Sequence, residues 1–353
     1  MAAGVCAYAK PDLRRKTDCC GSLTTANWHW HWQLLPESLL FTVELHILPR
    51  VVITWKEFVE THPIRSIALD GYVKGRPRFN REGTHVNFDH HEHVNRFATR
   101  CTASQVSMAI KGGLLSVFTP ENTAVWVNDC DWDVCLAVWL LRNPTRIVGT
   151  RSEPLISRIV FNTDMMDTCA GAYPIDPNDR IMEEMAWVFA PYRDARSQRK
   201  VSHLNAAEME TIIDTVLDRI SLYSIGQGQL QKPDTRYNVI GGGDDWKLVE
   251  EIGVDARTDM RAKGICAFVS YRGQENGRYI YSIGNLSPYG GFDLLLLYQK
   301  LNQVEGLLGN DVWGGSDNCG GSPRERGSSL SPEALTDQIE RFQHDLIRTT
   351  VGR

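Results

Sequence analysis

The apolar residues of the chain change their spacing several times, and these changes predict its elements. From about residue 51, short β-branched runs alternate with longer segments whose apolar residues recur every three or four positions. We predict strands at 64–70, 84–89, 124–127 and 156–161, and helices at 102–115, 134–141, 182–188 and 206–222. Strands that alternate with helices favour an α/β fold, with a mainly parallel sheet covered by helices on both faces.

A different pattern follows a linker-like stretch at 226–234, which is rich in Gly, Gln and Pro. Beyond it we predict strands at 265–271 and 279–283, helices at 294–301 and from about 332, and a glycine-rich loop at 314–321. This order is typical of a smaller C-terminal α+β domain. The predicted divisions are a poorly defined N-terminal extension (1–50), a first α/β domain (51–225) and a second domain (235–353).

The composition narrows the classes of protein. The chain of 353 residues is 42% hydrophobic and 23% charged, with a net charge of -5, which excludes a disordered or fibrous chain. This acidic balance disfavours binding of long duplex DNA, although a local cationic pocket can still take a small anion. The nine cysteines include no C-x-x-C pair, which indicates reduced thiols rather than a disulfide framework. With no apolar run of about 20 residues and no secretion signal, we expect a soluble, cytoplasmic protein without a membrane partner.

The strongest candidate for chemistry is the segment 87–93, in which three histidines and two acids follow the residues of a predicted strand. Mn²⁺ accepts imidazole and carboxylate ligands together, and sites of this mixture suit hydrolysis. Asp70 ends the preceding predicted strand, and two adjacent parallel strands would place Asp70 and His90 at one edge of the sheet. The alternative is a solvated polar loop. The pattern favours a metal site.

Two further acidic segments follow predicted strands. Asp129, Asp131 and Asp133 stand at alternate positions before a predicted helix, and Asp164 follows the run 156–161. Carboxylates this close repel one another unless a cation or a helix N-terminus neutralises them. Helix N-capping by Asp131 or Asp133 is the alternative interpretation. Together with the histidine segment, these acids are enough ligands for two ions ~3.5–4 Å apart that activate a bridging water.

These motifs resemble those of the DHH phosphoesterase superfamily. The residues that carry the resemblance are Asp70, Asp89-His90-His91, the three alternate acids at 129–133, and Asp164 with Asp167-Thr168. In the superfamily the D-x-D-x-D strand precedes the DHH strand, whereas here it follows by about forty residues. Either the domain is permuted, or the acids at 129–133 fill the later acidic element and a first element is missing. We favour permutation, which predicts that strand 125–127 lies beside strand 67–69.

The glycine-rich segment from Trp313 to Arg324 resembles part of the DHH-associated domain, which usually follows the catalytic domain. Glycines let backbone N–H groups converge on an oxyanion, and serine and arginine side chains add donors. Arg96 and Arg100 follow the histidine segment and suit bidentate phosphate binding, with a surface or structural role as the alternative. The predicted substrate-binding residues are Arg96, Arg100, Gly315, Ser316, Gly320, Gly321, Ser322 and Arg324.

The resemblance implies a phosphoesterase that uses two Mn²⁺ ions, with Mg²⁺ as an acceptable substitute. The implied metal ligands are Asp70, His90, Asp129, Asp131, Asp133 and Asp164, and the implied catalytic residues are His91 and Asp89. We expect a phosphate ester or anhydride of a small nucleotide or short single-stranded oligonucleotide as substrate, and a homodimer is compatible with the sequence. The alternatives are a non-catalytic nucleotide- or metal-binding regulator on the same fold, and an iron protein that uses the cluster for redox chemistry.

Overall fold

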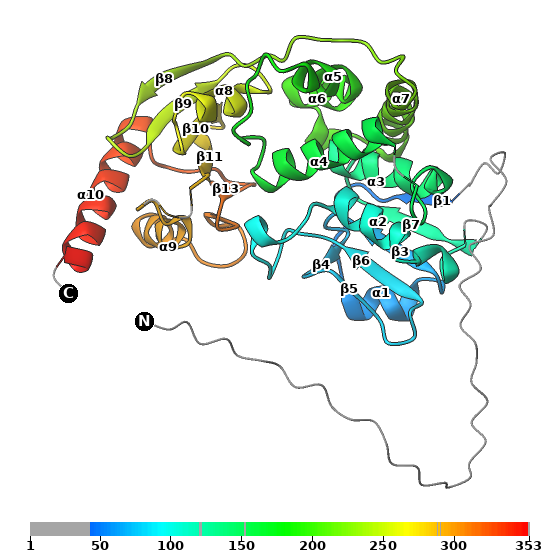
Figure 1. Ribbon diagram of the computed structural model, residues 1–353. Coiled ribbons are helices and arrows are strands. Elements are labelled where there is room, and N and C mark those ends of the chain that lie inside the picture. The colour runs from blue at the N-terminus through cyan, green and yellow to red at the C-terminus, as the bar shows by residue number, and fades with distance from the viewer. Residues whose placement is uncertain (1–42, 120–121, 152, 288, 290, 352–353) are drawn as a thin grey trace, which may run out of the picture. The chain divides into compact units, whose positions relative to one another are not determined.

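The computed structural model describes residues 43–119, 122–151, 153–287, 289 and 291–351, so the interpretations of residues 1–42 lie outside the described residues. The described chain belongs to the mixed α/β class (Figure 1). Its first sheet has five strands in the order β1-β7-β3-β6-β5. Their bounds are β1 Glu44–Ile47, β3 Ser66–Leu69, β5 Arg78–Phe79, β6 His85–Phe88 and β7 Ala124–Val127. All pairings in this sheet are parallel except that of the two-residue β5, as expected for a mainly parallel sheet.

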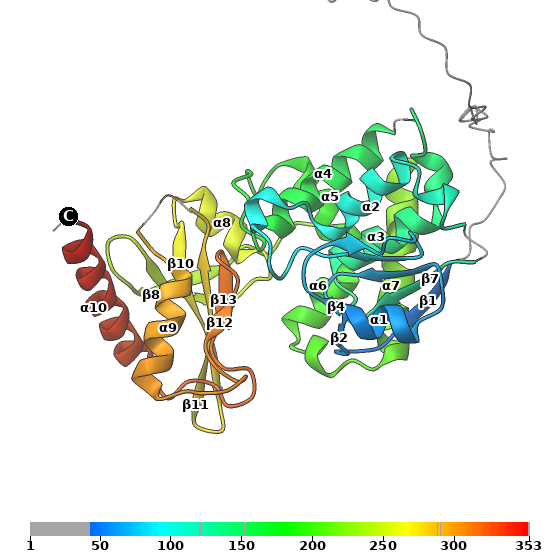
Figure 2. The ribbon, with the colours of Figure 1, turned by 90° about the horizontal axis from the view of Figure 1, so that it is seen from below.

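Both faces of this sheet are covered, but unequally. The helices of this part of the chain are α1 Trp55–Thr61, α2 Thr102–Lys111, α3 Trp132–Arg142, α4 Pro154–Thr168, α5 Arg180–Val188, α6 Ala190–Ser197 and α7 Ala206–Ser224. Because successive residues of a strand point to opposite sides, Ile67 and Leu69 of β3 join the large core with α2 to α5 and α7. Ala68 instead packs with Phe58 of α1 on the other face. Figure 2 shows α1 and α2 on opposite sides of the sheet.

The segment 156–161 is part of helix α4, so the prediction of a fourth strand there is wrong. The apolar and small residues that α4 buries recur at helical spacing, and they include Ile156, Ile159, Val160 and Thr163. This spacing outweighs the preference of β-branched side chains for strands. Pro154 stands at the start of α4, where its missing N–H costs nothing. Asp164 and Asp167 are therefore helical residues and do not follow a strand.

Residues 44–47 also differ from the expectation, because the sequence analysis places them in the N-terminal extension. They form β1, which pairs in parallel with β7 at one edge of the sheet. The sheet thus begins before residue 51. The pairing of β7 with β3 confirms the predicted neighbourhood of strands 125–127 and 67–69.

A second, mixed sheet follows residues 225–236, which form neither helix nor strand and include the predicted linker. Its six strands lie in the order β12-β13-β11-β10-β9-β8. Their bounds are β8 Tyr237–Gly241, β9 Lys247–Glu251, β10 Ala267–Glu275, β11 Arg278–Asn285, β12 Gly314–Gly315 and β13 Cys319–Gly321. The helices of this part are α8 Ala256–Ala262, α9 Leu294–Glu305 and α10 Pro332–Val351, and apolar residues of α9 and α10 form a second core with the sheet. Part of the predicted glycine-rich loop is therefore strand.

Direct contacts hold the second sheet against the C-terminal end of α4. Asn318 donates from Nδ2 to the Thr168 carbonyl at 2.7 Å, and Thr258 donates from Oγ1 to the Gly171 carbonyl at 3.0 Å. Since Thr168 directly follows Asp167, the glycine-rich segment lies beside one of the candidate acids. None of the helices in the described part of the chain is both long and apolar enough to cross a membrane.

Candidate metal centre

The candidate site begins where β3 and β6 end side by side. Asp70 follows β3 with φ of 50°, and its N–H donates to the Phe88 carbonyl at 2.9 Å. Asp89 follows β6, and its Oδ1 accepts from the backbone N of His90 at 2.7 Å and of His91 at 3.1 Å. The same oxygen lies 2.8 Å from Nδ1 of His91. Asp89 therefore fixes the loop and orients the His91 ring, which makes it a positioning residue in this geometry.

His90 lies at the centre of the acids with its side chain fully buried. Its Nε2 is 2.7 Å from Asp167 Oδ2, 3.5 Å from Asp70 Oδ1 and 3.8 Å from Asp133 Oδ2. Neither ring nitrogen is aligned for a hydrogen bond with any described group.

Among the described residues, two groups of side chains bring ligand atoms within 4.8 Å of one another, and they share His90. Their members are Asp70, His90 and His91 in one group, and His90, Asp133 and Asp167 in the other. A buried imidazole that lacks a hydrogen bond but faces several carboxylates fits a divalent cation, because Mn²⁺ and Mg²⁺ prefer oxygen ligands and Mn²⁺ also accepts imidazole. The residues present therefore fit the metal that the resemblance implies.

The N-terminus of α2 donates hydrogen bonds to two of the candidate metal ligands, Asp70 and Asp133. Helix α2 has Cys101 at its N-cap, whose side chain makes no capping hydrogen bond, so its first amides are free to bind carboxylates. Asp133 accepts from the backbone N of Thr102 at 2.7 Å and of Ala103 at 2.8 Å. Thr102 also donates from Oγ1 to Asp70 Oδ1 at 2.9 Å. One helix end thus holds Asp70, which follows β3, and Asp133, which lies in the first turn of α3.

Asp167 is the acid that sequence reasoning left out of the ligand set. Its Oδ1 accepts from the indole Nε1 of Trp132 at 3.1 Å, and its backbone carbonyl accepts from Nη2 of Arg96 at 2.8 Å. Burial would raise the pKa of Asp167, but His90, Arg96 and the Trp132 hydrogen bond outweigh it and hold this pKa well below its usual range. Asp167 is therefore an anion directed at His90. The signal in the sequence for Asp167 is the helical spacing of the apolar residues from Ile156 onward. The strand predicted at 156–161 instead places Asp164 nearest to the end of a strand.

Asp164 points elsewhere. Its Oδ1 accepts from the backbone N of Cys101 at 2.7 Å, and its Oδ2 lies 3.3 Å from Nη1 of Arg100. It belongs to neither group of converging ligand atoms. In this structure, Asp164 therefore binds the start of α2 and pairs with Arg100.

Asp129 and Asp131 lie near the centre without joining these groups. Asp131 caps α3 by accepting from the backbone N of Val134 at 2.9 Å, and Asp129 accepts from that of Cys130 at 2.6 Å. Burial and the neighbouring acids raise the pKa of Asp131 well above its usual range, and burial also raises the pKa of Asp129. Burial, Asp167 and Asp70 raise the pKa of Asp133 to about 7. Of the three alternate acids, Asp133 alone reaches the described clusters, and capping accounts for Asp131.

A cavity of about 1130 Å³ adjoins the candidate metal ligands at His91. Its lining includes His91 together with seven of the eight predicted substrate-binding residues, namely Arg96, Gly315, Ser316, Gly320, Gly321, Ser322 and Arg324. The glycines also have a structural reason, because a Cβ at Gly320 would lie 2.3 Å from both the Gly314 carbonyl oxygen and the Tyr298 hydroxyl. They permit close packing of the strands at the wall of the cavity.

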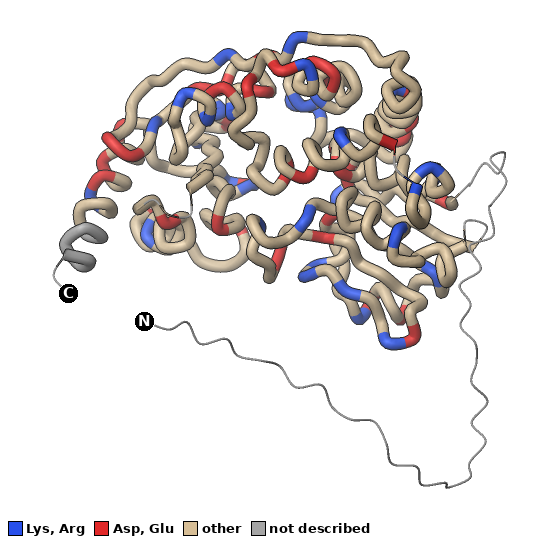
Figure 3. The backbone as a smooth tube through the Cα atoms, viewed as in Figure 1, with Lys and Arg blue, Asp and Glu red and all other residues tan. Residues whose placement is uncertain are grey.

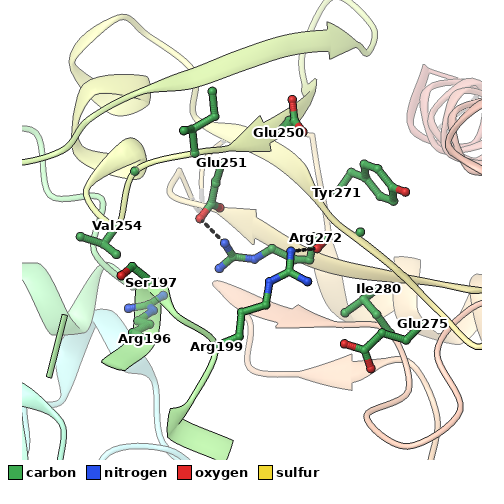
Figure 4. A pocket seen from close by; sticks show the side chains of 13 residues that line it. Arg196, Ser197, Arg199, Glu250, Glu251, Val254, Tyr271, Arg272, Glu275 and Ile280 are labelled. Atoms are coloured by element: carbon green, nitrogen blue, oxygen red, sulfur yellow. Dashed lines mark hydrogen bonds and ion pairs between the residues drawn. The ribbon is translucent and has the colours of Figure 1, made fainter. Parts of the chain in front are cut away.

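Three arginines that the sequence analysis did not single out also line this cavity: Arg196, Arg257 and Arg272. Arg196 and Arg272 continue into a neighbouring pocket of about 410 Å³, where Arg199 joins them (Figure 4). Glu251 is the shared counter-ion, 2.9 Å from Arg257 Nε and 3.0 Å from Arg272 Nη1. The recurrence of arginine at 196 and 199 in the sequence signals only the α6 side of this cluster, because Arg257 and Arg272 come from α8 and β10.

Comparisons of the chain with family models, with curated proteins and with solved structures found no match.

Proposed function

We propose that the chain is a metal-dependent phosphoesterase, related to the DHH superfamily, that hydrolyses a phosphate ester or anhydride of a small nucleotide or short oligonucleotide. The observation that carries the proposal is the buried His90 imidazole among Asp70, Asp133 and Asp167, beside a cavity lined by arginine. Acids and a histidine hold divalent metals, and arginines bind phosphate. The combination supports phosphate chemistry over the alternative of a redox iron site.

The residues that would hold the metal are Asp70, His90, Asp133 and Asp167, and Mn²⁺ bound there would supply an activated water and a Lewis acid. Arg96 donates from Nη2 to the Asp167 carbonyl and lines the cavity, so it positions Asp167 and faces the substrate. Its Nε is buried without a hydrogen bond among the described groups. His91, whose side chain is 47% exposed, is placed to contact the reacting phosphate.

In this proposal, residues of the first sheet and its helices bind the metal, and residues of the second sheet bind the substrate. The second sheet contributes Ser316, Arg324 and the glycines to the cavity wall. Arg196 has no ion pair among the described residues and stands where the cavity continues toward Arg199, so it suits the non-reacting anionic part of a substrate. The cysteines in the described part of the chain are free, which supports the proposed cytoplasmic location.

The test is a Mn²⁺-dependent assay after chelation, with a panel of nucleotides, dinucleotides and pyrophosphate. Asp133→Asn is expected to lower kcat at least about 100-fold, because it removes the charge of a metal ligand. The matched control is Asp214→Asn, since Asp214 is an exposed acid of α7 that pairs with Arg142 at 3.4 Å. Bound Mn²⁺ without hydrolysis of any member of the panel would instead favour the non-catalytic regulator.

A further inference from the structure

A second basic pocket, separate from the cavity described above, lies between α1, the loop from β4 Val73–Lys74 to β5, and the histidine segment. Its volume is about 620 Å³. The charged and aromatic side chains that line it are Trp55, Lys56, Lys74, Arg76, Arg78 and His93, and no acid is among the lining residues. Figure 3 shows basic positions in blue gathered along β4, β5 and α1.

Cations so close together repel one another unless an anion lies between them. Lys56 has a partner, Glu60, at 3.8 Å, but this pair is exposed and therefore weak. Lys74, Arg76 and Arg78 form no ion pair with any described residue. The pocket thus carries an excess of positive charge in a protein whose net charge is negative.

Arg78 is the best-defined donor in this pocket. Its guanidinium lies over the ring of Trp55, 4.8 Å from the ring centroid, which fixes its orientation. Its Nε is buried and has no hydrogen-bond partner among the described groups. Burial and the neighbouring Arg76 lower the pKa of Arg78, which agrees with a cation whose counter-charge is missing. A fixed guanidinium with an unused donor is suited to bidentate binding of a phosphate group.

His93 connects this pocket to the candidate metal centre. It has φ of 57°, a left-handed conformation that non-glycine residues rarely adopt. His91 and Glu92 line the large cavity, whereas His93 lines the basic pocket. The strained loop therefore separates two cavities and contributes to both.

We propose that the pocket of Trp55, Lys74, Arg76, Arg78 and His93 binds the phosphate group of an anionic ligand. The phosphate belongs either to a separate anion that binds beside the catalytic loop or to the distal end of the substrate. The proposal rests on this pocket alone and is independent of hydrolysis at the metal centre.

The experiment titrates metal-free, full-length protein with inorganic pyrophosphate by calorimetry. Arg78→Ala is expected to weaken one binding event about tenfold or more, since it removes a charge-assisted hydrogen bond. Arg78→Lys retains the charge without the planar fork and should give an intermediate affinity. Arg81→Ala is the matched control, because Arg81 is an exposed arginine three residues away that lines neither cavity. Arg324→Ala should weaken the other event, in the large cavity, and leave the Arg78-dependent event unchanged.

Identical isotherms for Arg78→Ala and Arg81→Ala would overturn the proposal, with far-UV circular dichroism confirming that both variants are folded. Lys74→Ala, at an exposed position, repeats the test without touching the Trp55 contact. If an active substrate is found, a higher KM for Arg78→Ala without added anion identifies the substrate as the ligand. An Arg78-dependent change of wild-type rate on adding pyrophosphate identifies a separate anion. The calorimetry stands even if no substrate is hydrolysed.

Discussion

Replacing Asp167 by asparagine should remove most of the stabilisation of the fold by Mn²⁺, whereas the same replacement at Asp164 should leave it intact. Both acids lie on α4, three residues apart, but their carboxylates have different partners. Asp167 Oδ2 is 2.7 Å from His90 Nε2, whereas Asp164 Oδ1 accepts from the backbone N of Cys101. An asparagine amide oxygen at 164 can still accept this hydrogen bond, and the charge lost there faces Arg100, whose side chain is 59% exposed.

The size of the effect follows from linkage. A metal present at 100 times its Kd stabilises the native protein by about 2.7 kcal/mol. For a folded unit of this length, 1 kcal/mol corresponds to about 2 °C in Tm, so wild-type and Asp164→Asn should each gain about 5 °C. If Asp167→Asn weakens Mn²⁺ about 100-fold, the same metal concentration only equals its Kd, and the gain falls to about 0.4 kcal/mol, or about 1 °C.

Differential scanning fluorimetry measures these shifts, with each variant compared with its own sample in chelator. The comparison removes any loss of stability that a substitution causes without metal. A Tm that rises equally in both variants would place Asp167 outside the metal shell. A loss of the shift in Asp164→Asn alone would instead restore the ligand set expected from the sequence.

Two further outcomes test the supporting contacts. Thr102→Val removes the hydroxyl that donates to Asp70 at 2.9 Å, and an equilibrium titration should show Mn²⁺ binding weakened about 10- to 100-fold. The control Thr102→Ser keeps the hydroxyl and should bind Mn²⁺ like the wild-type protein. Equal affinities of the two variants would refute an orienting role for Thr102. Glu251 is buried; burial would raise its pKa, but Arg257 and Arg272 outweigh this and lower it from 4.5 to about 2. Its ionised form therefore stabilises the fold above pH 4.5, and this stability is lost as the pH falls toward 2. The difference in unfolding free energy between wild-type and Glu251→Gln should shrink by about 3 kcal/mol over that range, as measured by urea denaturation; a difference independent of pH would contradict the assignment.

The sequence predicted the parallel sheet because each of its central strands is a short β-branched run followed by a turn. It also placed Asp70 and His90 at one edge, since the ends of adjacent parallel strands meet. In the structure, Asp70 Oδ1 lies 3.5 Å from His90 Nε2. Strands β3 and β6 follow each other closely in the sequence and pair in the sheet. The spacing of apolar residues was therefore enough to predict that their ends meet.

The place of the acidic segment with Asp164 and Asp167 was not predicted correctly, because this segment is part of helix α4. Ile156, Ile159 and Val160 have the residue types of a strand, but their helical spacing, which places them on one buried face of α4, outweighs that preference. Asp164 and Asp167 lie three residues apart on α4, and their carboxylates have different partners, Cys101 and His90. The alternation of a strand does not describe this arrangement. The arginines of the cavity were missed for a related reason: they come from α6, α8 and β10, whose approach is a property of the fold.

The arrangement around α2 explains how acids from distant segments are held together. Asp70, Asp133 and Asp164 come from the end of β3 and from helices α3 and α4, yet each accepts a hydrogen bond from the first turn of α2 or the residue before it. The N–H groups of a helix N-terminus carry partial positive charge and are free to bind. They can therefore hold the carboxylates close together before any cation arrives. A site whose carboxylates are already held by neutral donors loses less conformational entropy on binding its ion than a site of mobile carboxylates. The first turn of α2 therefore belongs to the candidate metal centre, although none of its residues is a candidate ligand.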